Sequence, residues 1–405
     1  MLTINIKIFY KSVITVCCVL LLSIVVLGPV HAAATPAESL DTLLNAVNKD
    51  PNNPQVYYNL GVTYGKQGHF TEALDAYSKA VQLKPDFPDA WYNMGLSYYQ
   101  LKQPEKEMES YKKAIQFKPN FAEAHYNLGL CYYDRQDYTV AVQSFKAAIN
   151  NQSKYPEAYY NMGLAYALLG QEREAINAYK QAITFKSDYP KAWYNMGVSY
   201  GALGDFQEEV SAYLKAIELK PEYISAYYNL GLAYYSLKQY PQAVEAYKKS
   251  ISLDPKFANS YLNLGLVYDK IGKGDEAIAQ YKLAIQNDPK NAKAYYNLGV
   301  ALSVLKQYPE AYEAYQSSIK TNPEYAQAYY NLGVVCYNMG KFQEEIDYYK
   351  RAIHVQPSYV SAHYNLGLAY LGMGQKDQAR LQYSELVKFD QAAADKLLVA
   401  INKNK

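Results

Sequence analysis

The chain has 405 residues, and its 40 Lys and Arg are nearly balanced by 38 Asp and Glu, which leaves a formal net charge of +2. This balance provides no basic surface field to hold a phosphate backbone, so nucleic acid is excluded as an expected partner. The composition is unusual in one respect, since it has 47 Tyr but only 11 Phe and 2 Trp. Such an excess indicates an aromatic residue that recurs at one place in a repeat.

The N-terminal segment has the pattern of a secretory signal. Lys7 and Lys11 precede an apolar run over 13–27, and a Gly-Pro pair with an Ala-rich stretch follows. The sequence therefore predicts a signal peptide over 1–34, cut within the Ala-rich stretch, and an exported chain that is periplasmic or secreted. The alternative is a retained membrane anchor, because the apolar segment over 12–30 just reaches the length that spans a bilayer.

Residues 35–53 follow and are predicted to form one short helix. Leu40, Leu43 and Val47 have the i, i+3, i+7 spacing of a helix face, and Pro51 comes soon after them. This spacing predicts a helix over 37–50. Because the segment lacks the signature that begins after it, we expect it to cap the first unit of the array.

A five-residue signature, YYNLG or a close variant, then recurs ten times at a period of 34 residues without insertion or deletion. The signature glycines are Gly61, Gly95, Gly129, Gly163, Gly197, Gly231, Gly265, Gly299, Gly333 and Gly367. A fixed period of this length indicates a stacked array of supersecondary units. We number each unit from 1 to 34 starting at Pro54, which places the signature at positions 4 to 8 and ends the tenth unit at Ala393.

Each unit contains two apolar stripes at helical spacing. Positions 4, 7, 8 and 11 share one face of a first helix, and positions 20, 24, 27 and 28 share one face of a second. Pro at position 32, as in Pro85 and Pro119, stops the second helix. Small residues at positions 8, 20 and 27 predict a close approach of the two helices. Each unit is thus a helix hairpin that depends on its neighbours to bury its faces.

Two kinds of departure from the pattern are chemically notable. Glu107, Glu209 and Glu345 replace the small residue at position 20. We expect their long stems to carry the carboxyl groups to solvent, with a subsite in a binding groove as the alternative. Cys131 and Cys336 lie six units apart, too far for a disulfide, and are expected to be small core residues.

The repeated pattern W/Y-x-x-L-G-x-x-Y, then A-x-x-x-F/Y-x-x-A, then Pro resembles the tetratricopeptide repeat family over 54–393. The resemblance implies an all-α solenoid, a right-handed superhelix of helix hairpins whose first helices line a concave groove. Residues 394–405 are expected to end a C-terminal capping helix, on which Leu397 and Ile401 share a face.

Catalytic chemistry is not expected. His125 and His363 occupy position 4, where other units have Tyr or Trp, and His69 and His354 lie in distant units. No histidines have the short spacing of a metal site. The glycines lie within helices and not in a phosphate-binding loop. We therefore predict that the chain is not an enzyme and holds no metal or cofactor.

Positions 2, 5, 6, 9, 12 and 13 form the opposite side of the first helix, here called the first-helix face, and the resemblance places this face on the groove. Position 6 is Asn in every unit: Asn59, Asn93, Asn127, Asn161, Asn195, Asn229, Asn263, Asn297, Asn331 and Asn365. An amide pairs with both the C=O and the N–H of a backbone. The row is similar to the asparagine ladder in the repeat region of the O-linked N-acetylglucosamine transferases. It is predicted to hold an extended peptide, unless the amides bond locally.

Position 5 is predicted to add aromatic rings to the groove, except where Leu262 replaces the ring. The candidate binding rings are Tyr92, Tyr126, Tyr160, Tyr194, Tyr228, Tyr296 and Tyr330. Position 12 varies among units, as a specificity surface requires. The sequence thus predicts an exported scaffold for a peptide or protein segment. The alternatives are a glycan-binding module, since Tyr rings stack on sugars, and the recognition subunit of a separate glycosyltransferase. A membrane contact is expected only if the N-terminal segment is retained.

Overall fold

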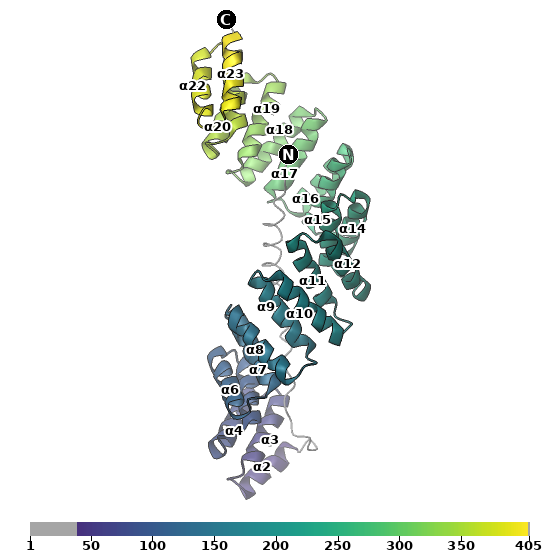
Figure 1. The fold of residues 1–405 in the computed structure, drawn as a ribbon, viewed down its shortest axis with the longest axis vertical. Helices are drawn as coiled ribbons and strands as arrows, with labels where there is room; N and C mark the ends of the chain where they lie inside the picture. Colours follow the sequence, from purple (N-terminus) through teal and green to yellow (C-terminus); the bar gives the residue numbers. More distant parts are fainter. Residues whose placement is uncertain (1–38, 404–405) are drawn as a thin grey trace. The chain divides into compact units, whose positions relative to one another are not determined.

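The computed structural model describes residues 39–403, and all regular structure in this range is helical, with 22 helices. This confirms the predicted all-α fold class. The chain divides into two compact units, Met1–Pro221 and Glu222–Lys405, which we describe one at a time. In each unit, helices follow one another in pairs along the chain (Figure 1). The predicted signal or anchor lies outside the described residues. None of the helices within 39–403 is long and apolar enough to cross a bilayer.

The first unit begins with a capping helix, α2 (Leu40–Lys49), within the range predicted for it. Its first helices are α3 (Pro54–Lys66), α5 (Pro88–Gln100), α7 (Ala122–Asp134), α9 (Pro156–Leu168) and α11 (Pro190–Leu203). Its second helices are α4 (Phe70–Leu83), α6 (Pro104–Phe117), α8 (Tyr138–Asn151), α10 (Glu172–Phe185) and α12 (Phe206–Leu219). Leu43 of α2 packs with Leu60 and Ala76, so the capping helix covers the first hairpin.

The second unit has the same arrangement and ends in a capping helix, α23 (Gln391–Lys403). Its first helices are α13 (Ile224–Ser236), α15 (Ala258–Lys270), α17 (Ala292–Val304), α19 (Ala326–Asn338) and α21 (Val360–Gly372). Its second helices are α14 (Tyr240–Leu253), α16 (Gly274–Asn287), α18 (Tyr308–Thr321), α20 (Phe342–Val355) and α22 (Lys376–Leu386). In α23, Leu397 and Ile401 are fully buried, as the apolar spacing predicted.

One left-handed residue closes each hairpin at position 15. Six hairpins have Gly there, and the other four have a Lys or Gln with positive φ. The glycines are Gly68, Gly170, Gly204, Gly272, Gly340 and Gly374, and the others are Lys102, Gln136, Lys238 and Lys306. The backbone N–H of the next residue returns to the carbonyl at position 11, for example from Gln239 to Tyr234 at 2.8 Å. This closure ends the first helix and reverses the chain within three residues.

The glycine at position 8 provides the close approach that the pattern predicted. A Cβ atom at Gly231 would lie 2.6 Å from the ring of Tyr247, the position-24 residue of the same hairpin. Alanines at positions 20 and 27 meet the facing helix from the other side, and Ala73 and Ala80 are fully buried. In the last hairpin Leu397 of the capping helix takes the place of the ring against the signature glycine.

The tyrosine at position 5 lies in the core, and the prediction that its ring lines the groove is wrong. The ring of Tyr58 is 6.0 Å from that of Tyr77 at position 24 and 4.8 Å from that of Phe87 at position 34. Equivalent ring pairs recur in both units. The aromatic residue at position 34, which follows the second helix, packs against the position-5 ring. The buried face of the first helix therefore includes position 5 as well as positions 4, 7, 8 and 11.

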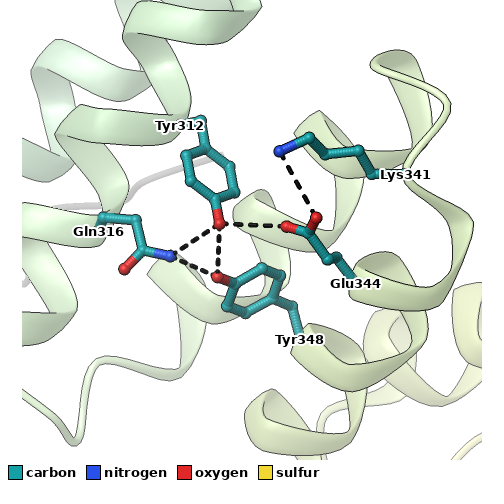
Figure 2. A network of polar contacts seen from close by, with 5 residues as sticks. All are labelled: Tyr312, Gln316, Lys341, Glu344 and Tyr348. Carbon is teal, nitrogen blue, oxygen red and sulfur yellow. Dashed lines mark hydrogen bonds and ion pairs between the residues drawn. The ribbon is translucent and has the colours of Figure 1, made fainter.

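The junction between α18 and α20 is held by a network of polar contacts. Figure 2 shows Tyr312 and Gln316 of α18 facing Glu344 and Tyr348 of α20. The Tyr312 hydroxyl donates to Glu344 Oε2 at 3.1 Å and lies 3.0 Å from the Tyr348 hydroxyl. Gln316 Nε2 donates to both hydroxyls, and Lys341 pairs with Glu344 Oε1 at 3.5 Å. Together these contacts fix the beginning of α20 against α18.

This network replaces a contact that other junctions share. In several of them a Lys at position 25 lies over the position-11 ring of the next hairpin, as Lys350 does over Tyr370 at 5.8 Å. At the α18–α20 junction, position 25 is Gln316 and position 11 is Cys336, so both the cation and the ring are missing. Tyr312 and Tyr348 pack against the core there and supply the lost aromatic surface.

Candidate functional site

The asparagines of position 6 join neighbouring hairpins within each unit. Seven of the amide nitrogens donate to the position-5 tyrosine hydroxyl of the hairpin before them, at 2.8–3.3 Å. The pairs are Asn93–Tyr58, Asn127–Tyr92, Asn161–Tyr126, Asn195–Tyr160, Asn263–Tyr228, Asn331–Tyr296 and Asn365–Tyr330. A buried hydroxyl needs a partner, and the asparagine supplies one. The recurrent Tyr-Asn dipeptide is thus an interlock between hairpins.

The interlock fails at one place, which shows how it works. Position 5 of the seventh hairpin is Leu262, and the amide nitrogen of Asn297 in the next hairpin is buried without a partner in the described part of the chain. Position 34 of the same hairpin is also not aromatic, because Asn291 stands there and caps α17 through the N–H of Ala294. The seventh hairpin has therefore lost the ring, its hydroxyl and its aromatic cover together.

The predicted binding residues now divide by exposure. The rings at position 5 are buried, with Tyr92 and Tyr194 almost fully so, and only Tyr330 of the proposed set is partly exposed. Among the asparagines, Asn93, Asn127, Asn195, Asn229 and Asn297 are buried. Asn59, Asn161, Asn263, Asn331 and Asn365 are partly exposed. The geometry assigns the row a role between hairpins. Its role in holding a peptide stays a prediction.

Position 4 also has a structural role. In four hairpins its side chain reaches back to the carbonyl of the proline at position 32 in the preceding hairpin. Trp91 Nε1 donates to Pro85 at 2.9 Å, and the Nε2 atoms of His125 and His363 lie 2.8 and 2.9 Å from the carbonyls of Pro119 and Pro357. Tyr261 makes the same contact with Pro255 at 3.2 Å. Within 39–403, no three His, Cys, Asp or Glu residues are grouped so that they could hold a metal ion.

The three glutamates at position 20 are buried, so the expectation that their stems reach solvent is wrong. Glu107, Glu209 and Glu345 are 8%, 0% and 4% exposed. Position 20 lies in the tight contact between two helices, where a stem of two methylenes cannot extend past the facing backbone. Burial raises the pKa values of Glu107 and Glu345 to about 7. The Glu107 carboxyl accepts a hydrogen bond from the Cys131 thiol at 3.3 Å.

Cys131 and Cys336 are both free and buried. Burial raises the pKa of Cys336 to about 12 and that of Cys131 further, so neither thiol is reactive near neutral pH. The core role expected for them agrees with this placement.

A cavity of about 590 Å³ opens on the first-helix face of the second unit, where α19, α20, α21 and α23 meet. From the first helices it is lined by Val334, Tyr337, Asn365, Leu368, Ala369, Leu371, Gly372 and Met373. The second helix α20 adds Phe342, Glu345 and Tyr349, and the capping helix adds Ala400. Positions 6, 9 and 12 of adjacent hairpins therefore meet at this cavity, including the partly exposed Asn365.

The rim of this cavity is apolar and exposed. Tyr337 is 60% exposed and Phe342 48% exposed, and their rings stand edge to face with centroids 6.2 Å apart. Met373 and Leu368 are also exposed. Grouped exposed apolar side chains around a cavity are typical of a binding surface. Tyr337 belongs to position 12, whose variation indicated a specificity surface, and Glu345 is one of the three glutamates for which a subsite in the groove was the alternative. Phe342 was not predicted to bind, because it belongs to the second helix.

A second cavity, of about 520 Å³, lies in the first unit between α10, α11 and α12. It is lined by Trp193, Met196 and Tyr200 together with Lys180, Glu208 and other polar residues of the two second helices. The positions predicted to bind a partner do not line it.

Comparison with known proteins identifies the repeat. Residues 151–356 match the family described as the C-terminal domain of cilia and flagella-associated protein 70. Families described as tetratricopeptide repeats match 37–68, 64–102, 108–134 and 130–170, as well as 89–120 and 348–381. No curated protein matches the chain in sequence.

Several solved structures are similar to parts of this chain. MamA is 30% identical, with coverage of 41% of this chain and 97% of that chain and a TM-score of 0.40. YrrB, described as a TPR protein with an unusual peptide-binding site, is 21% identical, with coverage of 46% and 96% and a TM-score of 0.41. The C-terminal part of a TPR repeat-containing protein from Cytophaga hutchinsonii is 19% identical, with coverage of 60% and 99% and a TM-score of 0.53.

The last of these likenesses supports a shared fold, and the family matches together extend over most of the chain from residue 37 to residue 381. The interlocked hairpins, with their signature glycine against the position-24 ring, are the repeats that these families describe. The chain belongs to the tetratricopeptide-repeat family.

Proposed function

We propose that the chain is an exported, non-enzymatic scaffold that binds a protein or peptide segment in the groove on its first-helix face. The observation that carries the proposal is the cavity between α19 and α21 on that face, with the exposed rings of Tyr337 and Phe342 at its rim. Most of the recurrent tyrosines at position 5 are buried between hairpins. We therefore assign binding to the variable positions 2, 12 and 13 of the first helices and to the cavity beside them.

Export is part of the proposal and rests on the signal pattern over 1–34. A secreted scaffold would meet partners outside the cytoplasm. Mass spectrometry of the chain from its native host tests this, with loss of about the first 32–34 residues expected. A chain that retains Met1 and fractionates with membranes would instead support the anchor over 12–30.

Site-directed photo-crosslinking tests the binding surface. A photoreactive residue at Tyr337 should give discrete protein adducts, whereas one at the exposed Asp347 on α20 should not. The substitution Leu368→Asp places a charge in the cavity and should abolish the adducts. Leu381→Asp, an equal change at a residue 56% exposed on α22, is the matched control and should preserve them. Adducts that survive Leu368→Asp would place the partner elsewhere.

The glycan-binding alternative depended on tyrosine rings displayed in the groove. Most of the position-5 rings are buried in the interlock, so no observation favours this alternative. Crosslinking to a protein or to a glycan at Tyr337 distinguishes the two.

A further inference from the structure

The side chain of Glu345 is buried, and among the residues that the structure describes it has no hydrogen-bond or ion-pair partner. Its side chain is 4% exposed and lines the α19–α21 cavity, at a position where most hairpins have Ala. Within 39–403, no hydrogen-bond donor or cationic group is bonded to its carboxyl, and burial raises its pKa to about 7. A carboxylate that is largely removed from water is poorly hydrated, and a ligand that donates a hydrogen bond to it in the cavity relieves that penalty.

Comparison with Glu107 shows what is missing. Glu107 occupies the same position in the second hairpin, and its carboxyl accepts from Cys131, at position 10 of the following hairpin. The residue equivalent to Cys131 beside Glu345 is Ala369, which has no donor and lines the cavity. The cavity therefore occupies the side on which the matching acid in the first unit has its partner.

The charges nearby do not compensate for this. Lys341, the residue just before α20, pairs with Glu344 at 3.5 Å and lies over the ring of Tyr312 at 4.8 Å. It is thus held in the network of Figure 2 at the junction with α18. Of the residues that line the cavity, Glu345 alone has a carboxyl, and none has a cationic group. An incoming cation would meet no competing positive charge among the lining residues.

We propose that this cavity binds a basic protein segment, in which an apolar side chain enters among Val334, Leu368 and Leu371 while a neighbouring Lys or Arg pairs with Glu345. The inference rests on the proposed function and adds the chemistry of the partner. The apolar lining supplies affinity through buried surface, and the single carboxyl supplies selection for charge, because a cation that fails to pair leaves the buried acid uncompensated. Acidic segments are disfavoured at the same place.

Synthetic peptides test the selection directly. The probes are capped peptides in a Gly/Ser background that carry one Leu and one Lys at several spacings, with Gln or Glu replacing the Lys in matched sets. Fluorescence anisotropy against the full chain should show the best Lys peptide binding at least about 10-fold more tightly than its Gln partner, since a hydrogen bond between two charged groups is stronger than one from a neutral amide. The Glu peptide should bind most weakly.

Two variants give the result its meaning. Glu345→Gln keeps the shape but removes the charge, and should reduce the Lys-over-Gln preference to about 2-fold or less. Glu107→Gln is the matched control in the first unit and should leave the preference unchanged. Far-ultraviolet circular dichroism checks that both variants fold. If Glu345→Gln does not fold, the same test is made with Glu345→Ala, which has the residue that most hairpins have at this position.

Equal binding of Lys and Gln peptides, no binding of either, or a preference that persists in Glu345→Gln, would overturn the inference. Crosslinks at Tyr337 that are lost in Leu368→Asp would still support the proposed function in that case. The two ideas therefore fail independently.

Discussion

The side-chain amide of Asn297 is buried without a partner for its nitrogen, within the described part of the chain, because Leu262 stands where the interlock has a tyrosine. Seven other asparagines of the row each donate to a tyrosine hydroxyl 35 residues earlier in the chain. The hydrogen bond that joins neighbouring hairpins elsewhere is therefore missing between the seventh and eighth hairpins.

Restoring that interlock should stabilise the protein. We expect Leu262→Tyr to increase the free energy of unfolding by about 1 kcal/mol, because the new hydroxyl satisfies the Asn297 amide. Asn291 is smaller than the aromatic residues at position 34 elsewhere, which leaves room for the ring. Chemical denaturation measures the change. The reciprocal control, Tyr160→Phe, removes only the hydroxyl that Asn195 contacts at 2.9 Å and should cost about 1–2 kcal/mol. A lower stability in Leu262→Tyr would contradict this account of the interlock.

Replacing four asparagines together separates the structural role from the binding role. The combined substitution Asn161→Ala, Asn195→Ala, Asn229→Ala and Asn263→Ala should lower stability by several kcal/mol. Asn161, Asn195 and Asn263 each donate to a tyrosine hydroxyl, and each lost bond costs about 1 kcal/mol. Melting temperature and crosslinking at Tyr337 are measured on the same protein. Unchanged stability with lost crosslinks would instead show that the row binds the partner.

The contact of Gly231 with Tyr247 should not tolerate a side chain. Gly231→Leu forces the ring away from a position 2.6 Å from the new Cβ atom and should cost about 1–3 kcal/mol. Gly65→Ala is the control, because a Cβ there has no atom closer than 3.7 Å. That change should be neutral or stabilising by up to about 1 kcal/mol, since Ala is the better helix former. An unchanged melting temperature in Gly231→Leu would refute the close approach.

The left-handed residue at position 15 gives a simple stabilising change. Lys238 has a φ of 59° where six other hairpins have Gly. A left-handed backbone costs a residue with a Cβ about 1–2 kcal/mol, so Lys238→Gly should raise stability by about 1 kcal/mol. The exchange in reverse, Gly272→Lys, should lower it by a similar amount. Thermal denaturation of both variants checks the pair, and changes of equal sign would argue against the assignment.

The buried acids predict a pH dependence of stability. Burial raises the pKa values of Glu107 and Glu345 from 4.5 to about 7. The folded chain therefore binds these protons more tightly than the unfolded chain, and the resulting stability is complete below about pH 4.5 and is lost as the pH rises through 7. Melting temperature should fall between pH 5 and pH 8. In the double variant Glu107→Gln, Glu345→Gln, the loss of unfolding free energy between these pH values should be smaller by up to about 3 kcal/mol for each carboxyl removed. An equally steep slope in the variant would exclude these groups as its source.

The sequence by itself determined the hairpins and their close packing. Pro at position 32, the spacing of the apolar stripes and Gly at position 8 act through the backbone of a single unit, so their consequences follow from local geometry. The contact of Gly231 with Tyr247 is an example, because a glycine within a helix face indicates that another group packs closely against the backbone there.

Only the tertiary structure decided which way position 5 faces and what the buried acids meet. A ring about 100° from the predicted stripe can lie in the core or in the groove, and the aromatic at position 34, together with the next hairpin's asparagine, places Tyr58 in the core. Glu107 and Glu345 are the same residue at the same position, yet Cys131 faces one and a cavity faces the other. Their difference lies in the neighbouring hairpin, because burial and hydrogen bonding depend on atoms that only folding brings together.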